Sequence, residues 1–167
     1  MDEYSEYEIN QLIKVSKKLD TPNQLIDLKE KKNKVILHSV FNQKHKFMLE
    51  ITSGLKFHGK ASIHSLELKH REGLIRLDFK GRHTNPDNID ENVPKELIKY
   101  KSKVFNLDEP HLHVYVKGYG IRWAIPIQET QFKDCVFSKK DDLGYILSKF
   151  AKELNISDEL NIQTSLL

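Results

Sequence analysis

The fold is decided by the stretch Pro110-His111-Leu112-His113-Val114-Tyr115-Val116-Lys117-Gly118-Tyr119-Gly120-Ile121-Arg122-Trp123-Ala124-Ile125-Pro126-Ile127. Two β-rich runs flank a turn with two glycines, and polar and apolar residues alternate along the runs. This pattern predicts a β-hairpin with Gly118 and Tyr119 at the centre of a two-residue turn. Gly118 suits the first central position of a type II′ turn, because that position needs a positive φ.

The register of the hairpin follows from its side-chain pattern. A turn centred on Gly118 and Tyr119 gives one wholly apolar face and one face with the polar side chains. A slip of one residue moves every side chain of one strand to the opposite face and mixes the two faces, so the segregated register is preferred. The predicted pairs are Tyr115–Arg122, His113–Ala124 and His111–Pro126.

The polar face of the hairpin has two interpretations. His111, His113 and Tyr115 recur at every second position with Arg122 opposite Tyr115, so their side chains project from one face of the sheet. They are either solvated side chains on the open face of a half-buried sheet or part of a functional site. The repeated spacing and the facing arginine are the reasons to follow the second interpretation.

Length and composition predict one globular domain over residues 1–167. The chain has a mass of 19.6 kDa, 38% hydrophobic and 31% charged residues, and a net charge of +3, which is too small to identify a nucleic-acid partner. No apolar run approaches the roughly 20 residues that span a bilayer, and the acidic start is unlike a secretory signal. Because the single cysteine, Cys135, also fits a reducing compartment, we expect a cytoplasmic protein that contacts no membrane.

The predicted fold class is α+β, with an antiparallel sheet of five to seven strands between about Lys34 and Ile127, packed by N- and C-terminal helices. The apolar residues of Glu3–Leu19 and of Asp141–Leu154 follow the helical period. Between Lys34 and Lys80, apolar residues alternate with polar ones and are separated by turn residues, which predicts a meander. We expect a frayed helical turn in the tail, Ile156–Leu167.

The segment after the meander is a loop followed by an insert. Residues 81–88 are rich in Gly, Asn, Asp and Pro, which are typical of loops. Residues 88–109 form the insert, and its Pro94 is placed to begin a short basic helix. We expect Leu97 and Ile98 of this helix to point inward.

Three segments of the chain carry a specific combination of residues. They are Lys46-Phe47-Met48-Leu49-Glu50-Ile51 with Gly54; Arg76-Leu77-Asp78 with Gly81, His83 and Asn85-Pro86-Asp87; and the hairpin motif Pro-His-Leu-His-x-Tyr-x-x-Gly-Tyr-Gly-x-Arg-Trp-Ala-x-Pro. Together they resemble a family of small, functionally uncharacterised bacterial and phage proteins. The resemblance covers most of the chain and implies that the Asn-Pro-Asp loop meets the hairpin, but it supplies no activity. Many relatives have a short link in place of the insert, and the histidine-rich strand also resembles those of small toxins from toxin–antitoxin modules.

These segments contain side chains that are able to transfer protons and hold phosphate. Two imidazoles can serve as general base and general acid, and an arginine can bind a phosphate bidentately. Together they suit metal-independent RNA cleavage, in which the 2′-hydroxyl is deprotonated and the leaving oxygen is protonated. The candidate catalytic residues are His83, His111, His113, Tyr115, Arg122 and Asp78. The candidate substrate-binding residues are Arg76, Arg82, Asp87 and Lys117.

No cofactor is expected, although a metal site stays open as an alternative. Imidazole and carboxylate groups together can bind zinc, manganese or iron, but neighbouring arginines raise the cost of placing a cation there. The alternative metal ligands are His83, Asp87, His111 and His113. The histidines at positions 38, 45, 58, 64 and 70 lack ligand spacing, and we expect them to be structural or on the surface.

Two classes of function therefore remain open. In the first, RNA is the partner and the protein acts as a ribonuclease-like toxin. In the second, the protein binds without catalysis, and its partner is an antitoxin or a host defence protein. The insert, residues 88–109, is then the candidate contact surface.

Overall fold

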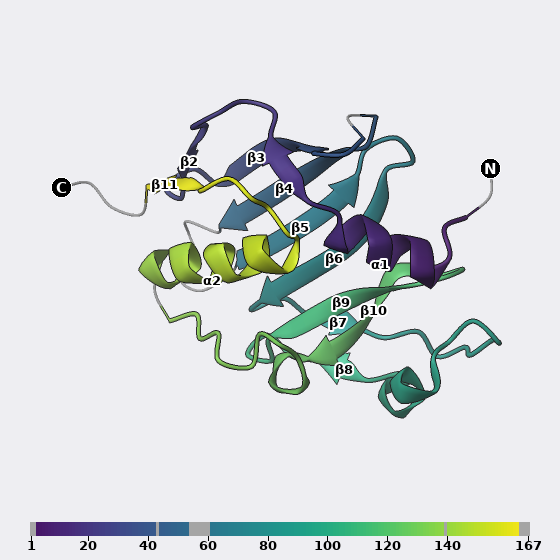
Figure 1. Cartoon of the computed structure of the whole chain (residues 1–167). Coiled ribbons are helices and arrows are strands. Elements are labelled where there is room, and N and C mark those ends of the chain that lie inside the picture. Colours follow the sequence, from purple (N-terminus) through teal and green to yellow (C-terminus); the bar gives the residue numbers. More distant parts are fainter. Residues whose placement is uncertain (1–2, 43, 54–60, 139, 164–167) are drawn as a thin grey trace.

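The computed structural model describes residues 3–42, 44–53, 61–138 and 140–163. Its centre is a seven-stranded antiparallel sheet in the order β1-β3-β4-β5-β6-β9-β10 (Figure 1). The predicted mixture of helices with an antiparallel sheet is confirmed, and most of the regular structure is strand. The strands of this sheet are β1 (Lys17–Leu19), β3 (Lys32–Ser39), β4 (Lys46–Ser53), β5 (Ala61–Glu67), β6 (Glu72–Phe79), β9 (His111–Val116) and β10 (Gly120–Pro126).

The meander buries one face of the sheet because apolar residues occupy every second position. Along β3, the side chains of Val35, Leu37 and Ser39 are buried, and those between them are partly exposed. The same alternation continues through β4 and β5, as expected for strands with one face in the core. Buried residues of both α-helices, α1 (Glu6–Lys14) and α2 (Lys140–Glu153), belong to this core cluster.

The N-terminal helix is shorter than predicted. It begins at a capping box, in which Ser5 Oγ accepts a hydrogen bond from the Glu8 N–H and the Glu8 carboxylate accepts one from the Ser5 N–H. It ends because Val15 leaves the helical region (φ −59°, ψ 136°), and the next residues pair with β3 as β1. The prediction that this helix continues to Leu19 is therefore wrong.

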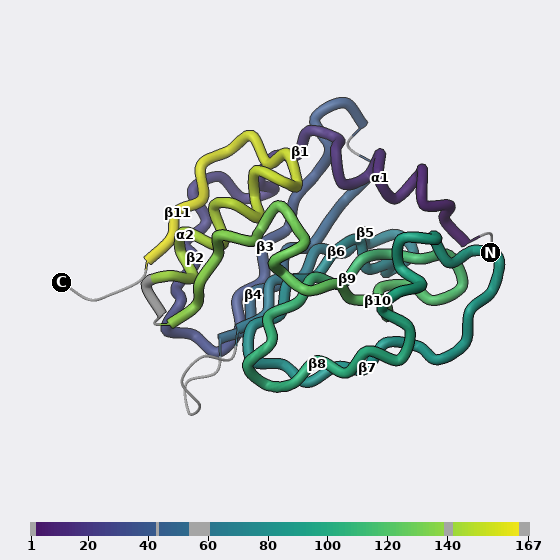
Figure 2. The backbone as a smooth tube through the Cα atoms, turned by 90° about the horizontal axis from the view of Figure 1, so that it is seen from below, coloured from purple at the N-terminus to yellow at the C-terminus, as the bar shows by residue number. Residues whose placement is uncertain are grey.

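The described part of the C-terminal tail contains a short strand in place of the predicted helical turn, and residues 164–167 lie outside the described residues. Residues Asn161–Gln163 form β11, which pairs in parallel with β2 (Leu25–Asp27) in a separate two-stranded sheet. A third small sheet joins β7 (His83–Thr84) to β8 (Val104–Phe105). Figure 2 shows both helices on one side of the main sheet and the β7–β8 segment on the other.

The hairpin differs from its predicted register at the turn. His113 pairs with Ala124 and His111 with Pro126, as predicted, but a bulge between Gly120 and Trp123 removes the predicted Tyr115–Arg122 pair. The loop is one residue longer than predicted, because positive φ angles at both glycines close it differently: Val116 pairs with Gly120. An extra residue then opposes Tyr115, as in other three-residue hairpin loops.

The insert packs beside the hairpin in a second hydrophobic cluster. Its short helix is a 3-10 helix, η1 (Lys95–Tyr100), in which Leu97 and Tyr100 are buried. Ile98 is exposed, so the prediction that it points inward is wrong. Tyr100 takes the inward position beside Leu97. The cluster consists of Val93, Leu97, Tyr100, Val116, Tyr119 and Trp123. In the described part of the chain, no helix is long and apolar enough to cross a membrane.

Candidate functional site

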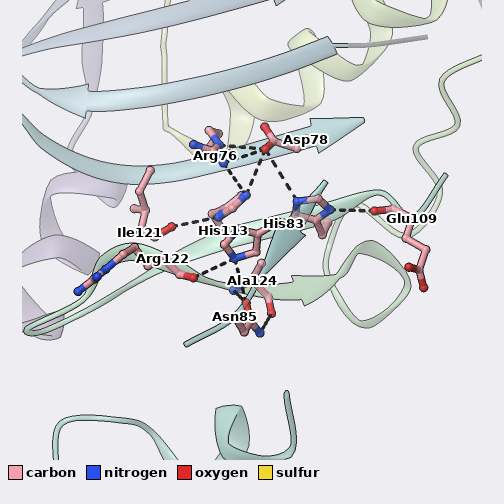
Figure 3. Close-up of polar contacts among 10 residues, drawn as sticks. Arg76, Asp78, His83, Asn85, Glu109, His113, Ile121, Arg122 and Ala124 are labelled. Carbon is pink, nitrogen blue, oxygen red and sulfur yellow. Dashed lines mark hydrogen bonds and ion pairs between the residues drawn. The ribbon is translucent and has the colours of Figure 1, made fainter. Parts of the chain in front are cut away.

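The candidate site lies where β6, β7 and β9 meet. Adjacent strands β6 and β9 pair Arg76 with His113 and Asp78 with His111, so all four side chains leave the same face of the sheet. His83, on β7, lies against them, and its ring centroid is 4.5 Å from that of His113 (Figure 3). We call Arg76, Asp78, His83, His111 and His113 the histidine cluster.

Asp78 is the negative charge of the histidine cluster. Its Oδ2 accepts hydrogen bonds from Arg76, with Nε at 3.1 Å and Nη2 at 2.9 Å, and lies 3.1 Å from His113 Nε2. Burial alone would raise the pKa of Asp78, but the bond to His113 and the charge of Arg76 outweigh it and hold the pKa well below its usual range. Asp78 is therefore ionised at neutral pH.

His113 has contacts at both ring nitrogens. Nδ1 lies 3.0 Å from the carbonyl oxygen of Ile121, so it carries a proton and donates it. Nε2 lies 2.7 Å from Arg76 Nη2 as well as 3.1 Å from Asp78 Oδ2. It can accept from Arg76 as a neutral ring or donate to Asp78 as a charged ring, and these two bonds exclude each other.

His111 is fully buried and only half satisfied. Its Nδ1 donates to the carbonyl oxygen of Glu109 at 2.8 Å, which leaves the lone pair on Nε2. That Nε2 makes no hydrogen bond and lies 3.8 Å from Asp78 Oδ2, and Asp78 Oδ1 is likewise without a partner among the described residues. Burial lowers the pKa of His111 to about 4, so the ring is neutral at neutral pH.

His83 and Phe105 cover the two inner histidines. The β7–β8 pairing places them opposite each other, and the Phe105 ring lies 4.5 Å from that of His111. His83 Nε2 lies 3.1 Å from Asn85 Oδ1 and 3.0 Å from the Arg122 carbonyl oxygen, so this nitrogen is the one that carries the proton. Burial and the neighbouring His113 lower the pKa of His83.

Asn85 fixes this cover to the edge of the main sheet. Its side-chain amide accepts from the N–H of Ala124 and donates to the Ala124 carbonyl, both at 2.8 Å, and also donates to Tyr100. It thus pairs with the outer backbone groups of β10 as a neighbouring strand does. From the sequence, Asn85 was expected only as part of a turn. Its place beside proline in a polar loop is the one feature of the sequence that points to a structural role for it.

Several predicted site residues lie outside the histidine cluster. Tyr115 is buried in the main core, where its hydroxyl donates to the Tyr4 carbonyl at 2.6 Å. Arg122 folds back onto the turn, where Nε donates to the Tyr119 carbonyl, and Figure 3 shows its side chain directed away from the histidines. Asp87 and Lys117 are exposed.

One interpretation of the sequence placed His111 and His113 on the open, solvated face of a half-buried sheet. The structure contradicts it. His111 and His113 have exposed fractions of 0% and 1%, because the β7–β8 segment covers them. Arg82, which precedes His83, is exposed, and the side chain of Arg76, which contacts His113, is 32% exposed. Arg82 and His83 line a shallow surface depression together with Thr84, Val104, Phe105 and Asn106.

The atoms that could hold a metal are not those of the predicted set. Among the described residues, one ligand atom each from Asp78, His111 and His113 lies within 4.8 Å of the other two. Asp78 thus takes the place that the sequence gave to Asp87. His83 cannot join through Nε2, because that nitrogen donates to Asn85 and Arg122.

Comparison with models of protein families assigns most of the chain to one family. A family of unknown function, DUF6978, matches residues 4–156, and the chain therefore belongs to this family. No curated protein and no solved structure matches it. Family membership agrees with the resemblance to an uncharacterised family and assigns no activity.

Proposed function

We propose that this member of DUF6978 is a cytoplasmic bacterial or phage protein that acts on RNA at the histidine cluster, in the manner of a ribonuclease-like toxin. The observation that supports the proposal is the convergence of three imidazoles, a carboxylate and a guanidinium from three strands. His83 lies 28 residues before His111 in the chain, and both rings nevertheless belong to one cluster.

Burial restricts which of these groups meets a substrate. His111 and His113 are enclosed, so they act behind His83 by holding its ring in place. His83 is only partly buried, and its Nε2–H is held by Asn85 and Arg122, which leaves the lone pair on Nδ1. In this proposal Nδ1 of His83 is the general base.

The reaction that fits such a base is transesterification of RNA. His83 Nδ1 takes the proton of a 2′-hydroxyl, the 2′-oxygen forms a bond to phosphorus, and the bond from phosphorus to the 5′-oxygen breaks. Water supplies the proton to the leaving 5′-oxygen. Arg82 beside His83 and the partly exposed Arg76 supply positive charge for the phosphate. The products are a 2′,3′-cyclic phosphate and a 5′-hydroxyl.

The proposal is tested with purified protein and a labelled single-stranded RNA. We expect His83→Ala to reduce cleavage about a hundredfold or more, which is typical for loss of a general base. His38→Ala is the matched control, because His38 is a partly exposed histidine on β3, and three strands lie between β3 and β9 in the sheet. No cleavage by folded wild-type protein, with or without added divalent metal, rules out the RNA proposal.

A second candidate function is supported by the surface of the insert. Four large hydrophobic side chains of residues 88–109 are exposed, namely Ile89, Ile98, Val104 and Leu107. Exposed apolar groups gathered in one segment favour a protein contact. A photo-crosslinking residue at Val104 tests this in cells, with one at exposed Tyr145 on α2 as control. Adducts that form equally at both positions contradict the contact.

A further inference from the structure

Two buried polar atoms of the histidine cluster have no role in RNA cleavage by His83. His111 Nε2 and Asp78 Oδ1 are enclosed and make no hydrogen bond to any described residue. An unpaired polar atom in the interior costs free energy, so each such atom in a folded protein calls for an explanation. His111 Nε2 carries a lone pair, and a lone pair is what a metal ion requires.

We propose that Asp78, His111 and His113 bind one divalent transition-metal ion, which takes the place of the Arg76 guanidinium. The proposal concerns the interior of the histidine cluster and holds whether or not the protein cleaves RNA. It adds Asp78, which the sequence did not include among the possible ligands, and it leaves out His83 and Asp87.

The spacing of the three donor atoms is close to that of a metal site. His113 Nε2 and His111 Nε2 lie 3.1 and 3.8 Å from Asp78 Oδ2, and all three atoms lie within 4.8 Å of one another. Ligands at about 2.0–2.2 Å from a metal lie roughly 3–3.5 Å apart when they are neighbours. Small side-chain movements therefore close the set around an ion.

Both histidines are oriented as metal ligands are. Each donates its Nδ1 proton to a backbone carbonyl, His111 to that of Glu109 and His113 to that of Ile121. Metal-binding histidines usually donate their second nitrogen to a carbonyl or carboxylate, which fixes the tautomer and directs the other nitrogen at the ion. Here the last residue of the insert, Glu109, and the hairpin residue Ile121 supply the two carbonyls, and both Nε2 atoms lie within 3.8 Å of Asp78 Oδ2. Figure 3 shows the His113 ring directed at Asp78.

Arg76 stands where the cation would bind. Its Nη2 lies 2.7 Å from His113 Nε2 and 2.9 Å from Asp78 Oδ2, so a positive group already bridges two of the three donors. The side chain is 32% exposed and can turn toward solvent, whereas His83 and Phe105 close the opposite side. A metal ion and the guanidinium therefore compete for the same place.

The donor set selects the class of metal. Two imidazole nitrogens and one carboxylate oxygen suit zinc, iron or manganese and are a poor match for calcium or magnesium, which prefer oxygen ligands. Three protein ligands leave at least one coordination position for water or a substrate atom. We use cobalt(II) as the spectroscopic probe and zinc for affinity.

The experiment uses tag-free, metal-free full-length protein, because a histidine tag binds the same metals. Titration with cobalt(II), followed by visible absorption, and with zinc, followed by calorimetry, should give one ion per chain. His111→Leu should weaken binding at least about tenfold. Arg76→Gln should strengthen binding by about tenfold, because it removes the competing charge. His38→Ala is the control, since His38 and Asp20 form a surface pair at 3.5 Å without a third ligand.

The opposite results overturn the proposal. Undiminished binding by folded His111→Leu places the metal elsewhere, and binding by Arg76→Gln alone shows that the native arginine keeps metal out. If neither the wild type nor Arg76→Gln binds metal, the proposal is also overturned. This result does not depend on a variant that loses a ligand. The RNA proposal is judged separately: metal binding without cleavage refutes only cleavage, and cleavage by protein that binds no metal refutes only the metal site.

Discussion

Lys17 and the histidine cluster are two buried polar regions whose hydrogen bonding differs. Lys17 has an exposed fraction of 0%, and its ammonium group has three donors. All three are used at 2.8–2.9 Å, by the carbonyl oxygens of Ile13, Val15 and Leu154. Of the histidine cluster, His111 and His113 are as deeply buried, but the cluster leaves His111 Nε2 and Asp78 Oδ1 without hydrogen-bond partners among the described residues.

The difference separates a structural group from a candidate functional one. Lys17 joins the C-terminal ends of α1 and α2, where carbonyl groups lack helical partners and the helix dipoles favour a cation. Every polar atom involved gains a bond, so stability alone accounts for this lysine. Stability does not account for the open atoms of the histidine cluster, because a folded protein gains nothing from leaving them unpaired.

The largest expected effect comes from removing the fully bonded group. Lys17→Met should lower the free energy of unfolding by about 3–5 kcal/mol, because it leaves one buried and two partly buried carbonyls without their hydrogen bonds to Lys17. The measurement is urea unfolding, with a shifted midpoint and an unchanged slope. Exposed Lys18→Met is the control and should change stability by less than about 0.5 kcal/mol. A loss of stability below about 1 kcal/mol for Lys17→Met would contradict the view that Lys17 is a structural group.

A second fully bonded group should behave like Lys17 on a smaller scale. Asn85→Asp keeps the size of the side chain but removes its two donated bonds, to the carbonyls of Ala124 and Tyr100. We expect the free energy of unfolding to fall by about 2–3 kcal/mol, measured as for Lys17. The control is Asn88→Asp at an exposed position of the same loop. Equal stabilities of the two variants would show that Asn85 does not hold β7 to β10.

Much of the fold could be predicted from side-chain periodicity. The inner positions of β3 and the pairs of His111 and His113 in the hairpin followed from alternation, because a slip of one residue exchanges the faces of a strand. The turn could not be predicted. Gly118 and Gly120 both permit positive φ, so a two-residue and a three-residue loop fit the sequence equally, and the longer loop removes the predicted Tyr115–Arg122 pair.

The burial of the histidines could not be predicted for a different reason. The bonds from Asn85 to Ala124 bridge 39 positions, and no local pattern reveals which loop will cover a polar strand. The sequence therefore allowed His111 and His113 to lie on the open face of a half-buried sheet. Because their exposed fractions are 0% and 1%, an alanine at either position leaves a cavity, so replacements of similar volume are the informative ones.

The smallest effect on stability is expected at His111. It tests whether the unpaired atoms of the histidine cluster contribute to stability. His111→Leu loses one hydrogen bond, to Glu109, but also removes the unpaired Nε2 and adds apolar contact with Phe105. These contributions are each about 1–2 kcal/mol and have opposite signs, so the stability of metal-free protein should change by no more than about 1 kcal/mol. Metal must be removed first, because a ligand bound only to the folded state adds stability.

His113→Leu is the matched control, because His113 lies on the same face of β9, is equally buried and has contacts at both nitrogens. Its replacement should cost about 2–3 kcal/mol, since it leaves the Ile121 carbonyl and the Arg76–Asp78 pair without their partner. Urea unfolding of both variants side by side measures the difference. If His111→Leu proves as costly as His113→Leu, His111 contributes to stability as Lys17 does, and the contrast that points to a ligand disappears. If the two variants differ as expected, the unpaired His111 Nε2 lowers the stability of the folded protein, and no structural role accounts for it.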